Sequence, residues 1–237
     1  MFQEYTTKLT SKILLANNIY QFGFELIEPE LLEFIPGQYL LLCIGDKVRQ
    51  YSIATPNSSK KYFEIVVEIF PGGVASEYLF KSRLNDQILF KGPAGVFNLK
   101  DNPGVTKRIF LATGTGIAPI KSMILSTVDQ FEMQYHLFWG ARYKKDVYYA
   151  DLFFDLTRKY QNFKYNVCLS RENDQQSNQS YFIFDRIDHC LKEMILSDQK
   201  SVVQFYLCGS AKTVLLLNQL LLENGVDKNQ IIFERFT

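Results

Sequence analysis

The sequence predicts two domains of different fold class: an antiparallel β-barrel over residues 1–102, then a doubly wound α/β domain with a parallel sheet over residues 103–237. Three observations predict them. The first hundred residues hold short strand-like runs between glycine and proline turns, which is typical of a small barrel. After Pro103-Gly104, strand-like runs alternate with helical patterns, which is typical of a parallel sheet. A glycine-rich loop within residues 109–119 joins an apolar run to an amphipathic segment.

The strands of the first domain are predicted from alternation and from turn residues. Residues 62–69 place Phe63, Ile65, Val67 and Ile69 on one face, the pattern of a half-buried strand. Glycine and proline residues separate this run from its neighbours. Further strands are expected at residues 8–16, 19–27, 39–44 and 87–91, with one helix at about 75–84.

The second domain is predicted from alternating periods. In the segment after the glycine-rich loop, Ile117, Ile120, Ile124 and Val128 share one helical face. Strands are expected at residues 107–112, 134–139, 164–169 and 202–208, and helices at 117–130, 147–160, 184–197 and 211–224.

Composition excludes several classes of function. Of 237 residues, 47% are hydrophobic and 22% charged, a globular balance, and the net charge of +1 offers no basic surface for nucleic acid or anionic membrane. Cys43, Cys168, Cys190 and Cys208 form no C-x-x-C pair, so no metal site is expected. Because neither a signal peptide nor an apolar run of about 18 residues is found, a cytoplasmic protein without a membrane span is expected.

The glycine-rich loop has the residues of a phosphate-binding turn. Gly114 and Gly116 follow an apolar run, and Pro119 suits the first turn of a helix. Such a loop brings backbone N–H groups to a phosphate at a helix start. Proline replaces the third glycine of G-x-G-x-x-G, and no acidic residue follows about 20 positions on. A plain strand-to-helix connection is the alternative.

A second group of residues lies in the predicted barrel. Arg49 and Tyr51 are two positions apart on a strand and therefore share a face, where they offer a cation for phosphate and a ring for stacking. An ordinary exposed strand is the alternative. Gly72 and Gly73 precede the predicted helix and again free backbone N–H groups for a phosphate. A simple turn is the alternative for the glycine pair alone.

Taken in this order, the Arg-x-Tyr-Ser stretch, the Gly-Gly turn, the Gly-Thr-Gly loop, Trp139-Gly140-Ala141-Arg142 and Cys208-Gly209 resemble the ferredoxin–NADP reductase superfamily over nearly the whole chain. They are similar above all to bacterial NAD(P)H-dependent flavin oxidoreductases, including reductases of sugar-deoxygenating enzymes, without an iron–sulfur domain. The resemblance implies that flavin contacts Arg49, Tyr51, Ser52, Ile53, Gly72, Gly73, Val74, Ser76 and Phe236.

The resemblance also implies a dinucleotide site and a reaction. NAD(P)H would contact Thr113, Gly114, Thr115, Gly116, Pro119, Arg142, Ser170, Arg171, Cys208 and Gly209. Ser52, Cys208 and Glu234 would shape the contact between nicotinamide and flavin, Cys208 by positioning rather than as a nucleophile. The Ser170-Arg171 pair favours NADPH over NADH, because arginine binds a phosphate bidentately. Tyr181 is a candidate aromatic face for adenine.

The implied function is hydride transfer from NAD(P)H to bound FAD, then electron transfer to a separate acceptor such as ferredoxin, flavodoxin or a partner enzyme. FMN remains an alternative flavin. A reductase of free flavin is the second hypothesis within enzymes, and a non-catalytic electron-transfer subunit docked to a partner enzyme is the hypothesis from another class. A monomer is expected.

Overall fold

The computed structural model describes residues 2–172, 180–197 and 202–236. They divide into two compact units. The first unit comprises the chain up to Leu99 together with Ala118–Ser126, and the second comprises Lys100–Ile117 and the chain from Thr127 onward.

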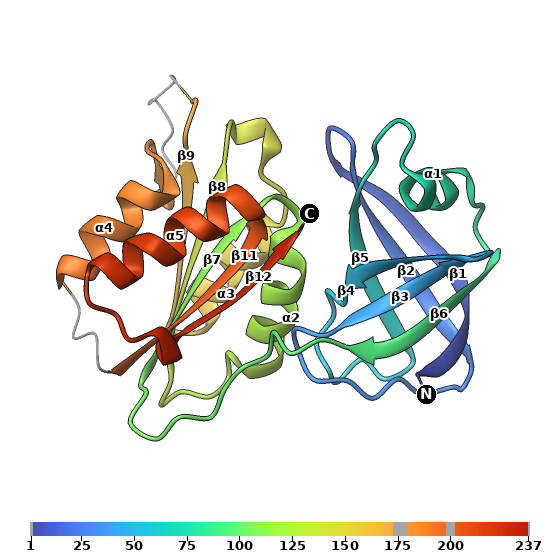
Figure 1. Ribbon diagram of the computed structural model, residues 1–237, viewed down its shortest axis with the longest axis horizontal. Helices are drawn as coiled ribbons and strands as arrows, with labels where there is room; N and C mark the ends of the chain where they lie inside the picture. Colours follow the sequence, from blue (N-terminus) through green and yellow to red (C-terminus); the bar gives the residue numbers. More distant parts are fainter. Residues whose placement is uncertain (1, 173–179, 198–201, 237) are drawn as a thin grey trace. The chain divides into compact units, whose positions relative to one another are not determined.

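The strands of the first unit form an antiparallel sheet in the order β4-β3-β6-β1-β2-β5 (Figure 1). The two outer strands meet through a bridge between Ile53 and Ile65, which closes the sheet into a barrel. Phe24, Phe63 and Phe90 fill its core with ring centroids 5.0–5.2 Å apart. The elements are β1 (Gln3–Ala16), β2 (Ile19–Glu28), β3 (Tyr39–Ile44), β4 (Lys47–Ser52), β5 (Tyr62–Glu68), α1 (Val74–Lys81) and β6 (Gln87–Ala94).

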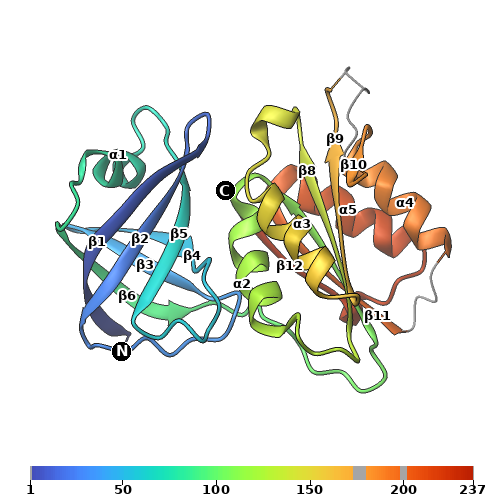
Figure 2. The same ribbon diagram turned by 180° about the vertical axis from the view of Figure 1, so that it is seen from behind.

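The second unit is built on a parallel sheet with the strand order β10-β9-β8-β7-β11-β12. Helix α3 covers one face, and α4 and α5 cover the other (Figure 2). The elements are β7 (Lys107–Thr113), η1 (Gly114–Gly116), β8 (Gln134–Ala141), η2 (Lys144–Asp146), α3 (Ala150–Lys159), β9 (Phe163–Leu169), β10 (Phe182–Ile183), α4 (Ile187–Ser197), β11 (Val203–Ser210), α5 (Ala211–Glu223), η4 (Lys228–Gln230) and β12 (Ile231–Phe236). Helix α2 (Ile117–Thr127) lies mostly in the first unit.

These two sheets confirm the predicted fold class. Several details differ from the sequence-based expectation. Strand β1 begins at Gln3 instead of residue 8, and helix α4 begins at Ile187 instead of residue 184. Helix α3 begins at Ala150 instead of residue 147, because Lys144–Asp146 form a 3₁₀ turn and Tyr149 is left-handed at φ 61°. The short strand β10 was not expected. Neither was β12, which pairs in parallel with β11.

Candidate functional site

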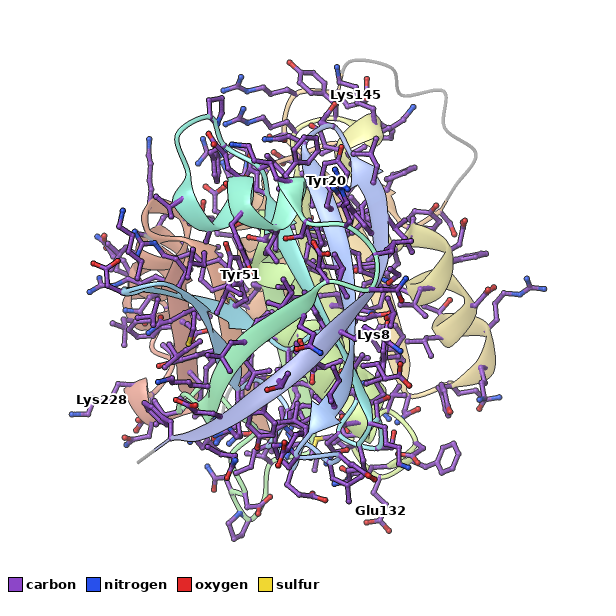
Figure 3. All side chains as sticks on the ribbon, turned by 90° about the vertical axis from the view of Figure 1, so that its right-hand side faces the viewer. Lys8, Tyr20, Tyr51, Glu132, Lys145 and Lys228 are labelled. Carbon is purple, nitrogen blue, oxygen red and sulfur yellow. The ribbon has the colours of Figure 1, made fainter. Side chains whose placement is uncertain are left out.

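Strand β4 carries the predicted flavin-contacting pair on an edge of the barrel sheet. Arg49 is exposed, and its guanidinium donates to the backbone oxygen of Val48 at 2.8 Å. Tyr51 (Figure 3) packs against the barrel core, and this burial raises the pKa of its phenol to about 12, although Arg49 opposes the shift. The phenol therefore stays neutral over the physiological range. Ser52 is buried at the end of the strand, beside the buried Ile53.

The Gly72-Gly73 turn opens helix α1. Gly72 has φ 79°, and a Cβ there would meet nothing within 4 Å among the described residues, so the space beside it is open. A Cβ on Gly73, the N-cap of α1, would lie 2.5 Å from Ser76 Oγ. Ser76 Oγ accepts from the Phe70 N–H at 3.3 Å and ties the turn together. Val74, the first helical residue, is 39% exposed.

Glu77 is a residue of this turn that the sequence analysis missed. Its Oε1 accepts the Gly72 N–H at 2.6 Å, and this bond, with Lys81 one helical turn on, holds the pKa of the Glu77 carboxyl below its usual value. A carboxylate on this N–H is the arrangement expected at the positive start of a helix, and it occupies the Gly72 donor. The glutamate at the fifth position after Gly72 was the available signal.

In the second unit, the predicted dinucleotide residues gather at the carboxyl edge of the parallel sheet. Strands β7, β8, β9 and β11 end there side by side. Ligands of open α/β sheets bind at this edge. The predicted residues on or just beyond these strand ends are Thr113, Gly114, Thr115, Gly116, Arg142, Ser170, Arg171, Cys208 and Gly209.

Close backbone packing explains two glycines at this edge. A Cβ on Gly116 would lie 2.4 Å from the backbone oxygen of Cys208, so the η1 loop presses directly on the end of β11. Gly209 has φ 149°, and its Cβ would lie 2.1 Å from Thr113 Oγ1. Thr113 Oγ1 is buried and has no hydrogen-bond partner among the described residues. A Cβ on Gly114 would meet nothing within 4 Å there, so the loop is open on that side.

Tyr148 is a second residue that the sequence analysis missed. It is buried, its hydroxyl donates to the Gly114 oxygen at 3.0 Å, and its ring packs edge-on against Trp139 at 4.6 Å. These contacts fix the η1 loop to the end of β8. No local pattern singled out Tyr148, because it lies in the turn before α3.

Arg142 and Arg171 are exposed and lie on adjacent chain segments beyond β8 and β9. The Arg171 N–H donates to the Arg142 oxygen at 3.0 Å, and Ser170 Oγ donates to the Ala141 oxygen at 3.3 Å. The structure therefore places these two predicted arginines on neighbouring chain segments. Tyr181, by contrast, is 6% exposed and packs against Tyr165 at 5.5 Å, which leaves its face covered rather than open for adenine.

The remaining predicted residues lie on α2 and β12. Pro119 is buried in the first turn of α2. Phe236 is half-buried and pairs with Ser210. In the same register, Glu234 lies opposite Cys208. Burial, and then the Glu234 carboxylate, raise the pKa of the Cys208 thiol well above its usual value, so the thiol stays protonated.

Burial also raises the pKa of Glu234 from 4.5 to about 7, and its buried Oε2 has no hydrogen-bond partner among the described residues. Because the folded state holds this proton more tightly than the unfolded state, Glu234 favours folding below pH 4.5 and loses that contribution as the pH rises through about 7. At about 1.4 kcal/mol per pKa unit, discounted for partial exposure, the loss amounts to about 1–3 kcal/mol.

The Glu234→Gln variant is therefore expected to show a flatter dependence of melting temperature on pH between 5 and 8 than the wild type. Gln keeps the shape of the side chain and cannot titrate. Thermal melts of both proteins across this range measure the difference, and parallel curves for the two would contradict the raised pKa.

No helix within residues 2–172, 180–197 and 202–236 is long and apolar enough to cross a membrane. Over the same residues, no group of three or more His, Cys, Asp or Glu side chains is arranged to hold a metal ion.

Comparison with known proteins agrees with this geometry. Residues 6–99 match the oxidoreductase FAD-binding domain family, and residues 110–215 match the oxidoreductase NAD-binding domain family. The chain is 28% identical to the reductase component of propane 2-monooxygenase from Rhodococcus jostii, over 99% of this chain and 64% of that protein. It is 26% identical to ferredoxin–NADP reductase B from Sorangium cellulosum, over 99% and 98%.

The same fold occurs in the crystal structure of the Amycolatopsis cytochrome P450 reductase GcoB, with a TM-score of 0.88 and 24% identity, over 100% of this chain and 70% of that one. Two family models, matched in order, thus account for most of the sequence and for both sheets. The chain belongs to the ferredoxin–NADP reductase superfamily, with an oxidoreductase FAD-binding domain followed by an oxidoreductase NAD-binding domain.

Proposed function

We propose that the chain oxidises NAD(P)H and passes two electrons through bound FAD to a separate acceptor. The observation that carries this proposal is a pair of glycine turns, one in each unit, with free space beside Gly72 and Gly114 and a helix directly after each turn. Each belongs to a domain whose family binds the matching cofactor, FAD for Gly72-Gly73 and NAD for Gly114–Gly116.

The residues of the barrel fit FAD. The start of α1 has no side-chain cap, so the first N–H groups of the helix are offered to a pyrophosphate beside the open space at Gly72, whose own N–H bonds to Glu77. Arg49 is exposed and provides a cation for the phosphate, while the half-buried ring of Tyr51 offers a neutral surface for stacking. We assign the flavin contacts to Arg49, Tyr51, Ser52, Ile53, Gly72, Gly73, Val74, Ser76 and Phe236. FMN, which lacks the adenosine part, is the alternative.

The residues of the second unit fit a dinucleotide. The orphaned Thr113 Oγ1 and the open side of Gly114 offer a donor and space to the pyrophosphate. We assign its contacts to Thr113, Gly114, Thr115, Gly116, Pro119, Arg142, Ser170, Arg171, Cys208 and Gly209. The domain boundary is proposed between residues 102 and 103.

When bound, FAD supplies the hydride acceptor and the store of two electrons. The protein's part is positioning, since proximity supplies most of the rate gain for such a transfer. We propose that Ser52 donates a hydrogen bond at the flavin and that Cys208 shapes the nicotinamide side as a protonated thiol. Glu234 holds a proton near neutral pH beside Cys208.

The acceptor class follows from the relatives, one of which is the reductase component of a monooxygenase and another a ferredoxin–NADP reductase. We propose a protein acceptor of the oxygenase or ferredoxin kind, reached in the cytoplasm by a monomeric reductase. Reduction of free flavin is the second candidate, and the open Gly72 turn favours retained flavin over it. Steady oxidation of NADPH by the isolated chain with ferricyanide separates an enzyme from a non-catalytic subunit.

NADPH is proposed as the preferred donor, and Arg171→Ala tests this. Loss of a charge-assisted hydrogen bond to the 2′-phosphate costs about 1.5–3 kcal/mol, so the Michaelis constant for NADPH is expected to rise about 10- to 100-fold. The constant for NADH is expected to stay the same, since NADH lacks that phosphate. Equal changes for both donors would contradict the assignment, and Arg158→Ala, on the exposed side of α3, is the control.

A further inference from the structure

We propose that the buried ion pair between Lys121 and Glu64 is a positioning pair for hydride transfer, holding helix α2 in one register on the barrel. The inference rests on the proposed function. Neither residue belongs to the flavin or dinucleotide contacts assigned above.

The pair is unusually well enclosed for two charged side chains. Lys121 Nζ lies 2.8 Å from Glu64 Oε2, and the two side chains are 7% and 17% exposed. The other carboxylate oxygen of Glu64 accepts from Gln21 Nε2 at 3.0 Å and from the Tyr62 hydroxyl at 3.2 Å. All four residues lie in the first unit. Glu64 is thus bound on both oxygens, and Lys121 is directed to a fixed point on β5.

Two serines of α2 hold the chain that follows β4. Ser122 Oγ donates to the Thr55 oxygen at 2.6 Å, and Ser126 Oγ accepts the Asn57 N–H at 3.1 Å. Strand β5, which contains Glu64, is bound to the same segment, because the Ala54 N–H donates to the backbone oxygen of Glu64 at 2.8 Å. Residues 54–57 directly follow Ser52 and Ile53 in the sequence. The helix is therefore bound to the continuation of the proposed flavin-contacting strand.

At its other end, α2 continues directly from the dinucleotide loop. The Ile117 N–H, at the first residue of α2, bonds to the Gly114 and Thr115 oxygens, and no residue separates η1 from α2 in the chain. That loop in turn presses on Cys208. Because η1 and α2 are consecutive in the chain, the proposed role of the pair is to limit, by fixing α2, the positions open to Gly114–Gly116.

The chemistry of the pair favours positioning over stabilisation. Desolvation offsets much of the attraction in a buried ion pair, and an apolar pair of similar volume is often at least as stable, whereas charged partners can specify a single arrangement. Hydride transfer needs such precision, because a misplacement of about 1 Å can cost about 100-fold in rate.

The test compares Lys121→Met, Glu64→Gln and the double variant with the wild type, each loaded with FAD. Anaerobic stopped-flow mixing with saturating NADPH measures the first-order rate of flavin reduction, and fluorescence quenching measures FAD affinity. The two single variants are expected to reduce flavin about 10- to 100-fold more slowly, with wild-type FAD affinity. The double variant is expected to recover part of the loss, since it leaves no unpaired buried charge.

A matched control lies in the same unit. Lys8 (Figure 3) and Glu25 form an ion pair of the same length, 2.8 Å, but their side chains are 38% and 52% exposed. Lys8→Met and Glu25→Gln are expected to leave the reduction rate unchanged. Hydrogen exchange in the flavin-free chain gives a readout independent of activity: amides of residues 114–127 are expected to exchange faster in Lys121→Met than in Lys8→Met.

The outcomes separate the two proposals. Should the wild-type chain bind no FAD or fail to be reduced, the proposed function is wrong, while hydrogen exchange still tests the anchoring. An unchanged saturating rate in folded Lys121→Met, or a loss confined to NADPH affinity, overturns the positioning role. Where Lys121→Met does not fold, the double variant takes its place, because it removes the pair without leaving a lone buried charge. A saturating rate below that of the wild type supports the proposal, and a wild-type rate overturns it.

Discussion

Among alanine substitutions of the glycines in the dinucleotide loop, Gly116→Ala is expected to give the largest loss of stability. The new Cβ would lie 2.4 Å from the Cys208 oxygen and 2.6 Å from the Gly209 nitrogen, both backbone atoms that cannot rotate away. Overpacking of this kind costs about 3 kcal/mol at its upper end, which lowers the melting temperature by about 6–12 °C. Binding of NAD(P)H is expected to weaken with it, because the loop must move off β11.

Differential scanning calorimetry and titration with NADP⁺ measure these two effects. Gly104→Ala is the matched control: Gly104 has φ 89°, but its Cβ would meet nothing within 4 Å among the described residues. That variant is expected to show only the cost of backbone strain, about 1 kcal/mol, and normal nucleotide binding. Equal melting temperatures for the two variants would contradict the close packing of Gly116 on Cys208.

Replacing Arg49 by alanine is expected to give the largest loss of flavin. The guanidinium is exposed at the edge of the barrel and bonds only to the Val48 oxygen in the hydrogen bonds described, so it is available to a phosphate. Loss of a charge-assisted bond costs about 1.5–3 kcal/mol, which weakens FAD binding about 10- to 100-fold. Equilibrium titration by flavin fluorescence measures the dissociation constant.

The control for this variant is Arg83→Ala, an exposed arginine beyond the end of α1 in the same unit. It is expected to bind FAD as the wild type does, at the same ionic strength. Were Arg49→Ala to keep full affinity, or the two variants to lose affinity alike, the assignment of Arg49 to the flavin phosphate would be wrong.

The fold class was predictable because its signals are local. Residues 107–119 combine an apolar strand, two glycines and an amphipathic helix, and the structure forms β7, η1 and α2 there. Strand β12 was not predictable in this way. Residues 231–236 alternate only partly in burial, and their strand depends on pairing with β11, whose partner residues lie 26 positions earlier in the chain.

The candidate site likewise has residues that local sequence signals predict and residues whose roles depend on distant contacts. The glycine turns are recognisable from the sequence alone. The structure explains why glycine stands at positions 73, 116 and 209, because a Cβ at each would lie too close to a neighbouring atom. Tyr148 acquires its role from Trp139, and Lys121 from Glu64, 57 residues away. Contacts between distant segments leave no periodic trace in the sequence. The roles of Arg49 and Arg171 stay predictions, since they depend on ligands rather than on the fold.

The central claim is that one chain holds FAD and reduces it with NAD(P)H. The most direct measurement is an anaerobic titration of the FAD-loaded chain with NADPH, followed by the visible absorbance of the flavin. The account predicts a yellow protein that retains its flavin through gel filtration and is bleached by an equimolar amount of NADPH. A protein that loses FAD on the column, or whose bound flavin stays oxidised with excess NADPH and NADH, would contradict it.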